Sequence, residues 1–309
     1  YIKEVFMPRS IEILTYDSEI CFFRREWGKP LDLNISLKKL KTGEKISRLF
    51  GAKEKTLRIK KLDESSLYSV KIKAFSIAHR FLNYSRSISV KPMMSPPSIL
   101  FIGSGRCGTT SIADYLDGLQ FNNGDRVCSR HETLFDYILP AITAGLENDI
   151  IRLYSGFRHD IEAAPHFSYI AGKLPVNKIV HIIRDGRRVV QSGINRGWYQ
   201  KDDMWERIKP NFQGSLFEKC CRFWTHRVQQ AELCSTRTIR LEDLACSRDE
   251  LAGLLAYLEI MPTNRILPKS NPGKISSDFQ KWDAEHRDMF FEICGEMMDI
   301  YYKDWQAEW

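Results

Sequence analysis

The chain has 309 residues, 43% of them hydrophobic, and a formal net charge of +7. This length and apolar content are enough for two folded domains with separate cores. No run is long and apolar enough to cross a bilayer. The basic residues are dispersed rather than gathered into a block, which argues against a nucleic-acid partner.

Residues 1–92 show short β-rich runs between turn signals and no long helical period, which predicts a small all-β sandwich. Tyr68 and the alternating apolar residues of 70–74 resemble the tyrosine-corner strand of fibronectin type III domains, and residues 87–92 resemble their last strand. Trp27 is the candidate for a core tryptophan of such a domain. A domain of this kind implies no catalysis and is expected to be a spacer, a protein or glycan contact, or a wall beside a neighbouring site.

Residues 93–97 lack periodicity and end in two prolines, so we expect a linker there. The next segment, 99–116, is an apolar run, then a glycine-rich turn, then a helix. Its two outer glycines have the spacing of a nucleoside-triphosphate phosphate loop, but a threonine stands where that loop carries its lysine. The turn and the helix N-terminus still predict a bound anion. The loop residues are Gly103, Ser104, Gly105, Arg106, Cys107, Gly108, Thr109 and Thr110.

A second apolar run that ends in a basic turn and enters a helix covers residues 178–198. Arg184 stands at the C-terminal end of the predicted strand, where open α/β sheets bind ligands. Ser192 and Arg196 are four residues apart and share one helix face, so all three side chains are expected on a second phosphate. The other basic residues of this turn are expected on a solvated face: Arg187 and Arg188. Either motif alone also fits an ordinary strand-turn-helix junction.

Together, and in this order, the two motifs resemble the sulfotransferases that use 3′-phosphoadenosine 5′-phosphosulfate (PAPS), in the branch of tyrosylprotein and bacterial carbohydrate sulfotransferases. The resemblance covers residues 98–309 and implies a three-layer α/β/α domain of the P-loop type with a parallel sheet. It implies that the first loop holds the 5′-phosphosulfate and the second motif the 3′-phosphate. It further implies transfer to a hydroxyl of a glycan, a small molecule or a protein tyrosine, with 3′-phosphoadenosine 5′-phosphate (PAP) as product and no metal.

Sulfuryl transfer needs an acceptor for the hydroxyl proton and positive charge on the leaving phosphate oxygen, for which Arg106 and the loop N–H groups are suited. By resemblance the base is Glu132, which we favour over its neighbour His131. Without a catalytic role, Glu132 would be an exposed acidic residue near the start of a helix. His131 would be an imidazole with no function. Many family members also carry a lysine before a Ser-Pro or Thr-Pro pair, but residues 163–165 are Ala-Ala-Pro. Either Arg106 carries more charge, or a substitute acts: His159, His166 or Lys274.

Lys274 belongs to a segment that resembles the loop closing over the cofactor in sulfotransferases, although a polar linker is an equal reading. Trp224 falls on the apolar stripe of a predicted helix, so we expect it in the core rather than beside an adenine. The segment 197–214 holds aromatic residues that could stack on an acceptor ring or pack on the domain. They are Trp198, Tyr199, Trp205 and Phe212.

The eight cysteines form no recognisable disulfide or metal framework. Reduced thiols favour the cytoplasm. Because the first residue is Tyr1 rather than Met, a fragment or processed form is expected, and a targeting or membrane-anchoring signal upstream stays open.

Two other functions stay open as well. A non-catalytic PAP-binding adaptor would explain the Ala-Ala-Pro stretch, and a P-loop kinase would need a lysine where Thr109 stands.

Overall fold

The computed structural model describes the backbone of seven strands between residues 11 and 90, and residues 96–268 and 278–309 in full apart from the side chains of Asp278 and Glu308. The chain forms two compact units. One comprises residues 1–96 with 136–138 and 152–158, and the other comprises the remainder. Lys274, Trp27 and the first part of the predicted linker, residues 93–95, lie outside the described residues.

The strands of the first unit form two antiparallel sheets, with the orders β1-β2-β5 and β4-β3-β6-β7. Tyr68 is the first residue of β6, which pairs with both β3 and β7. The strands are β1 (Ile11–Tyr16), β2 (Glu19–Arg24), β3 (Asp32–Lys39), β4 (Lys45–Phe50), β5 (Thr56–Ile59), β6 (Tyr68–Phe75) and β7 (Arg86–Val90). The predicted all-β character of this segment matches these strands.

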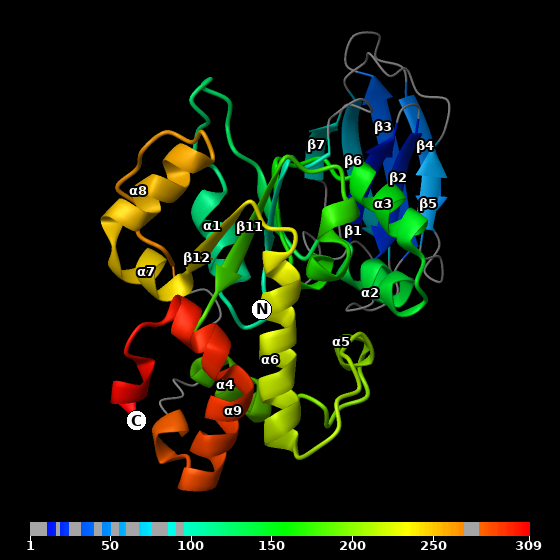
Figure 1. Ribbon diagram of the computed structural model, residues 1–309. Helices are drawn as coiled ribbons and strands as arrows, with labels where there is room; N and C mark the ends of the chain where they lie inside the picture. Colours follow the sequence, from blue (N-terminus) through cyan, green and yellow to red (C-terminus); the bar gives the residue numbers. More distant parts are fainter. Residues whose placement is uncertain are drawn as a thin grey trace. The chain divides into compact units, whose positions relative to one another are not determined.

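The second unit is an α/β domain built on a parallel sheet of five strands, in the order β12-β11-β8-β10-β9 (Figure 1). The strands are β8 (Ile99–Ile102), β9 (Ser129–His131), β10 (Ile161–Ala163), β11 (Lys178–Ile183) and β12 (Arg237–Arg240). All four residues of β8 are buried, as expected for a parallel strand covered on both faces. The chain runs from β8 first towards one edge of the sheet and then, from β11, towards the other. The order therefore reverses beside β8, where open α/β sheets bind their ligands.

Helices connect these strands, and polar caps define several of their starts. The α-helices are α1 (Thr109–Leu116), α2 (Phe135–Thr143), α3 (Glu147–Ser155), α4 (Gly186–Arg196), α5 (Met204–Arg207), α6 (Leu216–Glu232), α7 (Leu241–Cys246), α8 (Arg248–Tyr257) and α9 (Ala284–Tyr301). The 3₁₀ segments are η1 (Pro165–Tyr169), η2 (Ala171–Lys173), η3 (Asp278–Lys281) and η4 (Trp305–Glu308). Ser215 and Glu218 form a reciprocal capping box at α6, and Asp185 accepts a hydrogen bond from the N–H of Arg187 at α4. Among the described helices, none is long and apolar enough to span a membrane.

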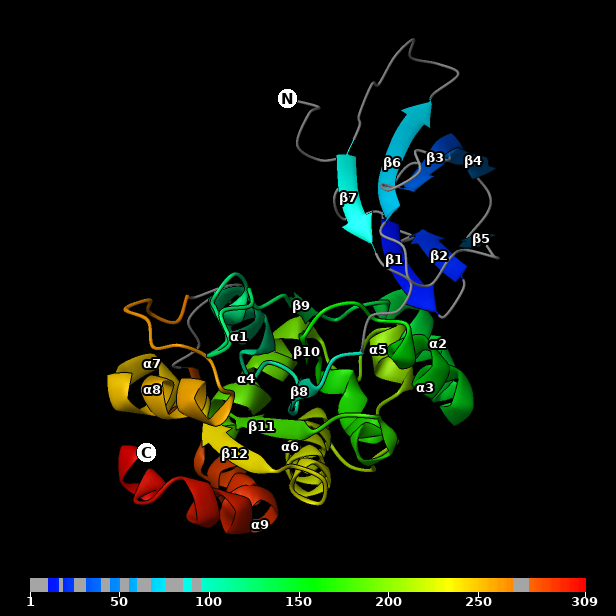
Figure 2. The same ribbon diagram turned by 90° about the horizontal axis from the view of Figure 1, so that it is seen from above.

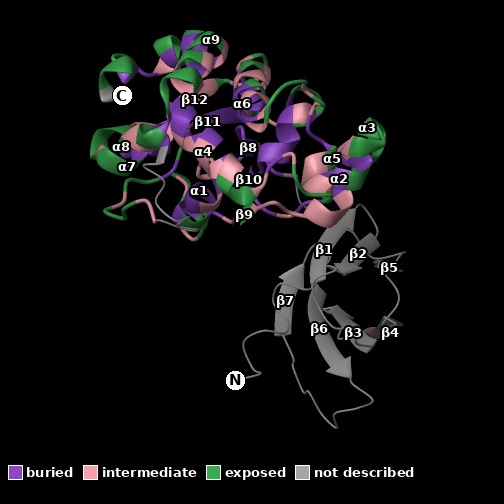
Figure 3. Ribbon diagram, turned by 90° about the horizontal axis from the view of Figure 1, so that it is seen from below, coloured by how far each residue is buried: buried purple, intermediate pink, exposed green. Residues whose placement is uncertain are grey.

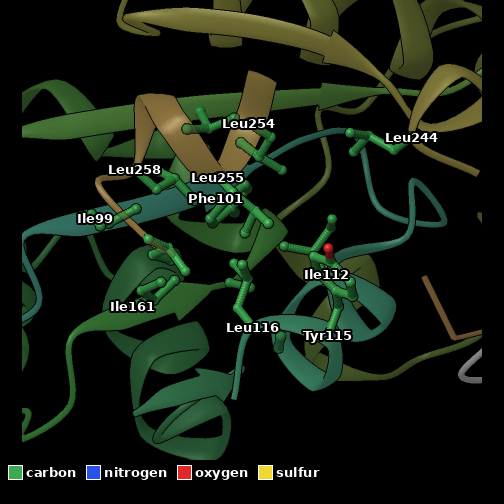
Figure 4. Packing of buried hydrophobic residues seen from close by; sticks show 14 of the residues in the cluster. Ile99, Phe101, Ile112, Tyr115, Leu116, Ile161, Leu244, Leu254, Leu255 and Leu258 are labelled. Atoms are coloured by element: carbon green, nitrogen blue, oxygen red, sulfur yellow. The ribbon is translucent and has the colours of Figure 1, made fainter. Parts of the chain in front are cut away.

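The two faces of the sheet are covered by different helices (Figure 2). On one face, Ile99 and Phe101 of β8 pack with residues of α1, α7 and α8, and Figure 4 shows Phe101 between Leu255 and Leu116. On the other face, α4, α6 and α9 enclose a cluster that contains Ile183 and the fully buried Trp224. Burial is deepest along the strands, while the outer sides of the helices are exposed (Figure 3). This arrangement is a layered α/β domain, and the core position predicted for Trp224 is confirmed.

Candidate functional site

The two predicted anion motifs meet at one edge of the sheet. The phosphate loop follows β8 and Arg184 follows β11, and these strands are paired in parallel. Their carboxyl ends therefore point the same way and lie next to each other. The turn at Glu132 follows β9 on the same edge. The described residues of both motifs and the turn at Glu132 thus lie along the carboxyl ends of the strands, with the two motifs at the point where the strand order reverses.

The loop backbone is shaped for close approach by an anion. Gly105, Arg106 and Gly108 have positive φ angles of 80°, 58° and 94°. A β-carbon on Gly108 would lie 2.5 Å from Leu241, so glycine is required there by space as well as by φ. No side chain caps the start of α1, which leaves first-turn N–H groups available to an anion.

Arg106 joins the first motif to the second. Its Nε donates a hydrogen bond to Oγ of Ser192 over 3.1 Å. Nη1 of Arg184 donates to the carbonyl oxygen of Arg106 over 2.9 Å. The loop is therefore held by both ends of the second motif, and one guanidinium spans the two predicted phosphate positions.

Three guanidiniums gather at this junction, and none of them forms an ion pair with a carboxylate among the described residues. Burial, followed by the charges of Arg196 and Arg184, lowers the pKa of Arg106 from its usual value. Three neighbouring guanidiniums without an ion-paired carboxylate form a site for a polyanion.

Arg187 is buried, so the prediction that it lies on a solvated face is wrong. It forms an ion pair with Asp185, the acidic residue that follows Arg184. Its side chain is 2% exposed and forms a bidentate ion pair with Asp185, with Nη2 and Oδ2 2.8 Å apart. Its guanidinium also donates to the carbonyl of Trp305 and stacks against Phe279. Because Arg187 neutralises Asp185, the carboxylate next in sequence to Arg184 is not available to it. Arg188 remains half exposed, as expected.

His131 is the last residue of β9, and Glu132 begins the turn that follows it. Nε2 of His131 is 3.2 Å from both Thr109 Oγ1 and Thr110 Oγ1, so the imidazole is tied to the first turn of α1. Glu132 has a φ of 51°, a strained value for this residue type, and its carboxylate acts electrostatically on Arg106. Both predicted proton acceptors therefore adjoin the loop, with Glu132 the one whose charge reaches the loop arginine.

A buried acid behind this turn was not anticipated. Glu162 is fully buried in β10, where Oε1 accepts the N–H of Thr133 over 2.9 Å and Oε2 is 2.7 Å from Nε2 of His159. The pair fixes the turn that carries Glu132. His159, one of the proposed substitutes for the family lysine, is thereby engaged with Glu162. His166 is fully buried with no hydrogen-bond partner on either ring nitrogen, and burial lowers its pKa to about 3.

Cys107 closes the underside of the loop. The side chain is fully buried, and burial raises the pKa of its thiol. A β-carbon on Gly103 would lie 2.4 Å from its sulfur, so the thiol fills the space behind that glycine. These features favour a tolerated small residue over a reactive thiol. In the described ranges, no three His, Cys, Asp or Glu side chains are grouped as a metal site requires.

The aromatic residues of 197–214 separate into core and site residues. Trp198 is buried, Tyr199 donates its hydroxyl hydrogen to the carbonyl of Pro210, and Phe212 packs edge-on against His226. Trp205 is only half-buried, and a β-carbon on Gly105 would lie 3.1 Å from its Cζ2 atom. Its indole also stacks on Phe135, with centroids 6.3 Å apart. Trp198 also reaches the loop, with its Cζ2 atom 3.9 Å from the same position, but it is buried, so Trp205 is the half-buried aromatic residue beside Gly105.

Comparisons with known proteins do not assign a family. No family model matches the chain, and no curated protein matches it. Solved structures that resemble it include one described as a myokine structure, 13% identical over 27% of this chain and 93% of that one, with a TM-score of 0.23. The fn3 domain of human collagen alpha-1(XX) chain is 13% identical over 30% of this chain and 85% of that one, with a TM-score of 0.24. The chicken CNTN1 FN1-FN3 domains are 17% identical over 26% and 30%, with a TM-score of 0.22.

Proposed function

We propose that this protein is a PAPS-dependent sulfotransferase. The observation that carries the proposal is the junction of Arg106, Arg184 and Ser192, where two anion motifs 78 residues apart are hydrogen-bonded to each other and neither arginine forms an ion pair with a carboxylate among the described residues. A ligand with two separated anionic groups is the natural partner of such a junction. Thr109 in place of the P-loop lysine favours a ligand without a triphosphate.

The donor set fits PAPS. The N–H groups of residues 105–110 suit the 5′-phosphosulfate, and Arg184, Ser192 and Arg196 suit the 3′-phosphate. PAPS supplies an activated sulfuryl group. Arg106, between the two subsites, stabilises the charge that develops on the leaving phosphate oxygen.

Glu132 is the proposed general base. In the transfer, the acceptor oxygen forms a bond to sulfur while the bond from sulfur to the leaving phosphate oxygen breaks, and Glu132 receives the hydroxyl proton. The strained turn, braced from behind by Glu162, holds this carboxylate beside the loop. Trp205 and Phe135 give the acceptor an aromatic surface next to Gly105. We therefore propose a ring-bearing acceptor hydroxyl.

Calorimetric titration with PAP in magnesium-free buffer tests the cofactor assignment. The parent should bind PAP without metal, and an Arg184→Ala, Ser192→Ala double variant should lose that binding. An Arg222→Ala, Lys219→Ala variant on α6 removes two side chains outside the site and should bind PAP like the parent. A folded parent that does not bind PAP would overturn the proposal.

One observation favours a second function, a PAP-binding protein without transferase activity. Ala163 and Ala164 are fully buried at the end of β10, so this strand end supplies no cation to the site. Tight PAP binding with no transfer to phenol or pyranoside acceptors would select this alternative.

We further propose that residues 1–92 form a fibronectin type III-like domain, joined by residues 93–97 to the sulfotransferase domain of 98–309. The support is the arrangement of seven strands in antiparallel sheets of three and four, with Tyr68 opening β6. Separate expression of 1–92 and 98–309 tests the boundary. Two cooperative unfolding transitions, each retained by one fragment, are expected.

A further inference from the structure

Arg227 is a buried arginine that no ion pair neutralises. It lies on α6, is 0% exposed, and forms no ion pair with a carboxylate among the described residues. Nη1 donates to Oε1 of Gln230 over 2.7 Å, and Nη2 donates to the carbonyl of Pro165 over 2.8 Å. Nε has no partner. A charged group in this position is costly unless something in the functional state compensates it.

The groups around this guanidinium are neutral. Its central carbon lies 3.7 Å from the centroid of the Tyr169 ring. Burial, together with the charge of Arg227, lowers the pKa of His181 to about 3, and for His166 the charge of His131 contributes as well. Both imidazoles are therefore uncharged near neutral pH, and Cys107 and Cys234, which also act on Arg227, are thiols with raised pKa values. None of these neighbouring groups carries a negative charge that could balance the positive charge of Arg227.

Arg227 is connected to the phosphate loop through one hydroxyl. Nη2 also donates to Oγ of Ser168, and this oxygen lies 3.2 Å from the carbonyl oxygen of Gly103, the first loop residue. Because a guanidinium only donates, Ser168 accepts from Arg227 and directs its own hydrogen towards a carbonyl, either that of Gly103 or that of Pro165. Cys107, in the middle of the loop, is within electrostatic reach of the same guanidinium. Arg227 thus lies behind the loop, connected through Ser168 to Gly103 and within electrostatic reach of Cys107.

We propose that Arg227 is a positioning residue of the anion site: its buried charge is balanced by the anion bound over the loop, and the Ser168 hydroxyl ties that charge to the start of the loop. The inference rests on the proposed function for the identity of the anion, PAPS or PAP. It adds a residue from α6, outside both sequence motifs. The charge of Arg227, rather than its hydrogen bonds alone, is what the site uses.

Two substitutions separate charge from hydrogen bonding. Arg227→Lys keeps the charge but loses the planar fork, whereas Arg227→Gln keeps donors to the carbonyls but loses the charge. Each protein is titrated with PAP and with inorganic pyrophosphate at pH 7, after its fold is checked by thermal unfolding. Arg222→Gln is the matched control, since Arg222 is an exposed arginine of the same helix. Ser168→Ala tests the connecting hydroxyl.

Arg227→Lys should bind PAP within about threefold of the parent, and Arg227→Gln about tenfold more weakly, because only the second substitution removes a charge that attracts the anion through protein of low dielectric constant. Ser168→Ala should fall between them, and Arg222→Gln should match the parent. If Arg227→Gln binds PAP as well as Arg227→Lys does, the inference is overturned while the proposed function stands. If the parent fails to bind PAP, the proposed function is overturned, and the pyrophosphate titrations test Arg227 separately. The same order of affinities for pyrophosphate supports the role of Arg227, and any other order overturns it.

Discussion

Nε of Arg106 and Oγ of Ser192 are 3.1 Å apart, although 86 positions separate the two residues in the chain. This hydrogen bond joins a glycine-rich loop after β8 to a helix after β11. The guanidinium of Arg106 thereby lies between the two proposed phosphate positions. A ligand that bridges the two motifs would therefore meet a single, continuous donor surface.

Glu132→Gln should abolish transfer while leaving PAP binding intact. The amide cannot take the acceptor proton, and loss of a general base typically lowers the rate by about 10²–10⁴-fold. The measurement is kcat for sulfuryl transfer together with the PAP dissociation constant. If His131→Gln instead removes activity and Glu132→Gln does not, the roles of the two neighbours are reversed.

Trp205→Ala should raise KM for a ring-bearing acceptor about fivefold, because one aromatic stacking contact contributes roughly 1 kcal/mol. The dissociation constant of PAP should stay the same. Phe212→Ala is the matched control, since this ring packs against His226 away from the loop. Equal changes in the two variants would mean that Trp205 only supports the fold.

Arg187→Met should lower the free energy of unfolding by about 3–5 kcal/mol, the usual result of leaving one partner of a buried ion pair uncompensated. Urea unfolding followed by circular dichroism measures the loss. Arg188→Met, at a half-exposed position of the same turn, should change it by less than about 0.5 kcal/mol. At a urea concentration where Arg187→Met is still folded, it should also bind PAP more weakly, because the freed Asp185 carboxylate competes for Arg184.

Stability should fall as the pH drops below 6.5. Burial lowers the pKa of His166 and of His181 from 6.5 to about 3. Between these pH values the two histidines bind protons in the unfolded chain but not in the folded protein. Each histidine then costs up to about 1.4 kcal/mol per pH unit, and the contribution is absent above pH 6.5. The free energy of unfolding of His166→Phe, measured from pH 7 to pH 5 beside the parent, should show a shallower decline. Parallel curves would contradict this origin of the acid sensitivity.

Local patterns were sufficient to predict the framework of the site. The apolar run of β8, the glycine turn and the helix starting near Gly186 were all expected, because buried parallel strands and helix caps leave clear marks in a sequence. Arg184 was placed by the predicted strand end and Ser192 by the helix spacing, whereas the hydrogen bonds of Arg106 to both were not predicted. Their roles towards PAPS stay predictions.

Residues whose environment depends on distant segments could not be assigned in this way. Arg187 was expected in solvent because of its charge, but η3 and η4, some 90 or more residues later in the chain, supply the ring of Phe279 and the carbonyl of Trp305 that enclose it. The burial of Arg227, in contrast, could have been predicted from the sequence of α6. Arg227 falls on the same helical stripe as Trp224 and Ala231, both buried, and an arginine on an apolar stripe indicates a buried charge.

The central place of β8 also bears on how the protein reaches its native state. Its two neighbours, β10 and β11, are both encoded later in the chain, so the glycine-rich turn leaves the ribosome long before the strands that orient it. Such non-local pairing slows folding, because long loops must close before any contact compensates for them. A ligand that binds the glycine-rich turn in the native domain would therefore stabilise only the completed fold and not an early intermediate.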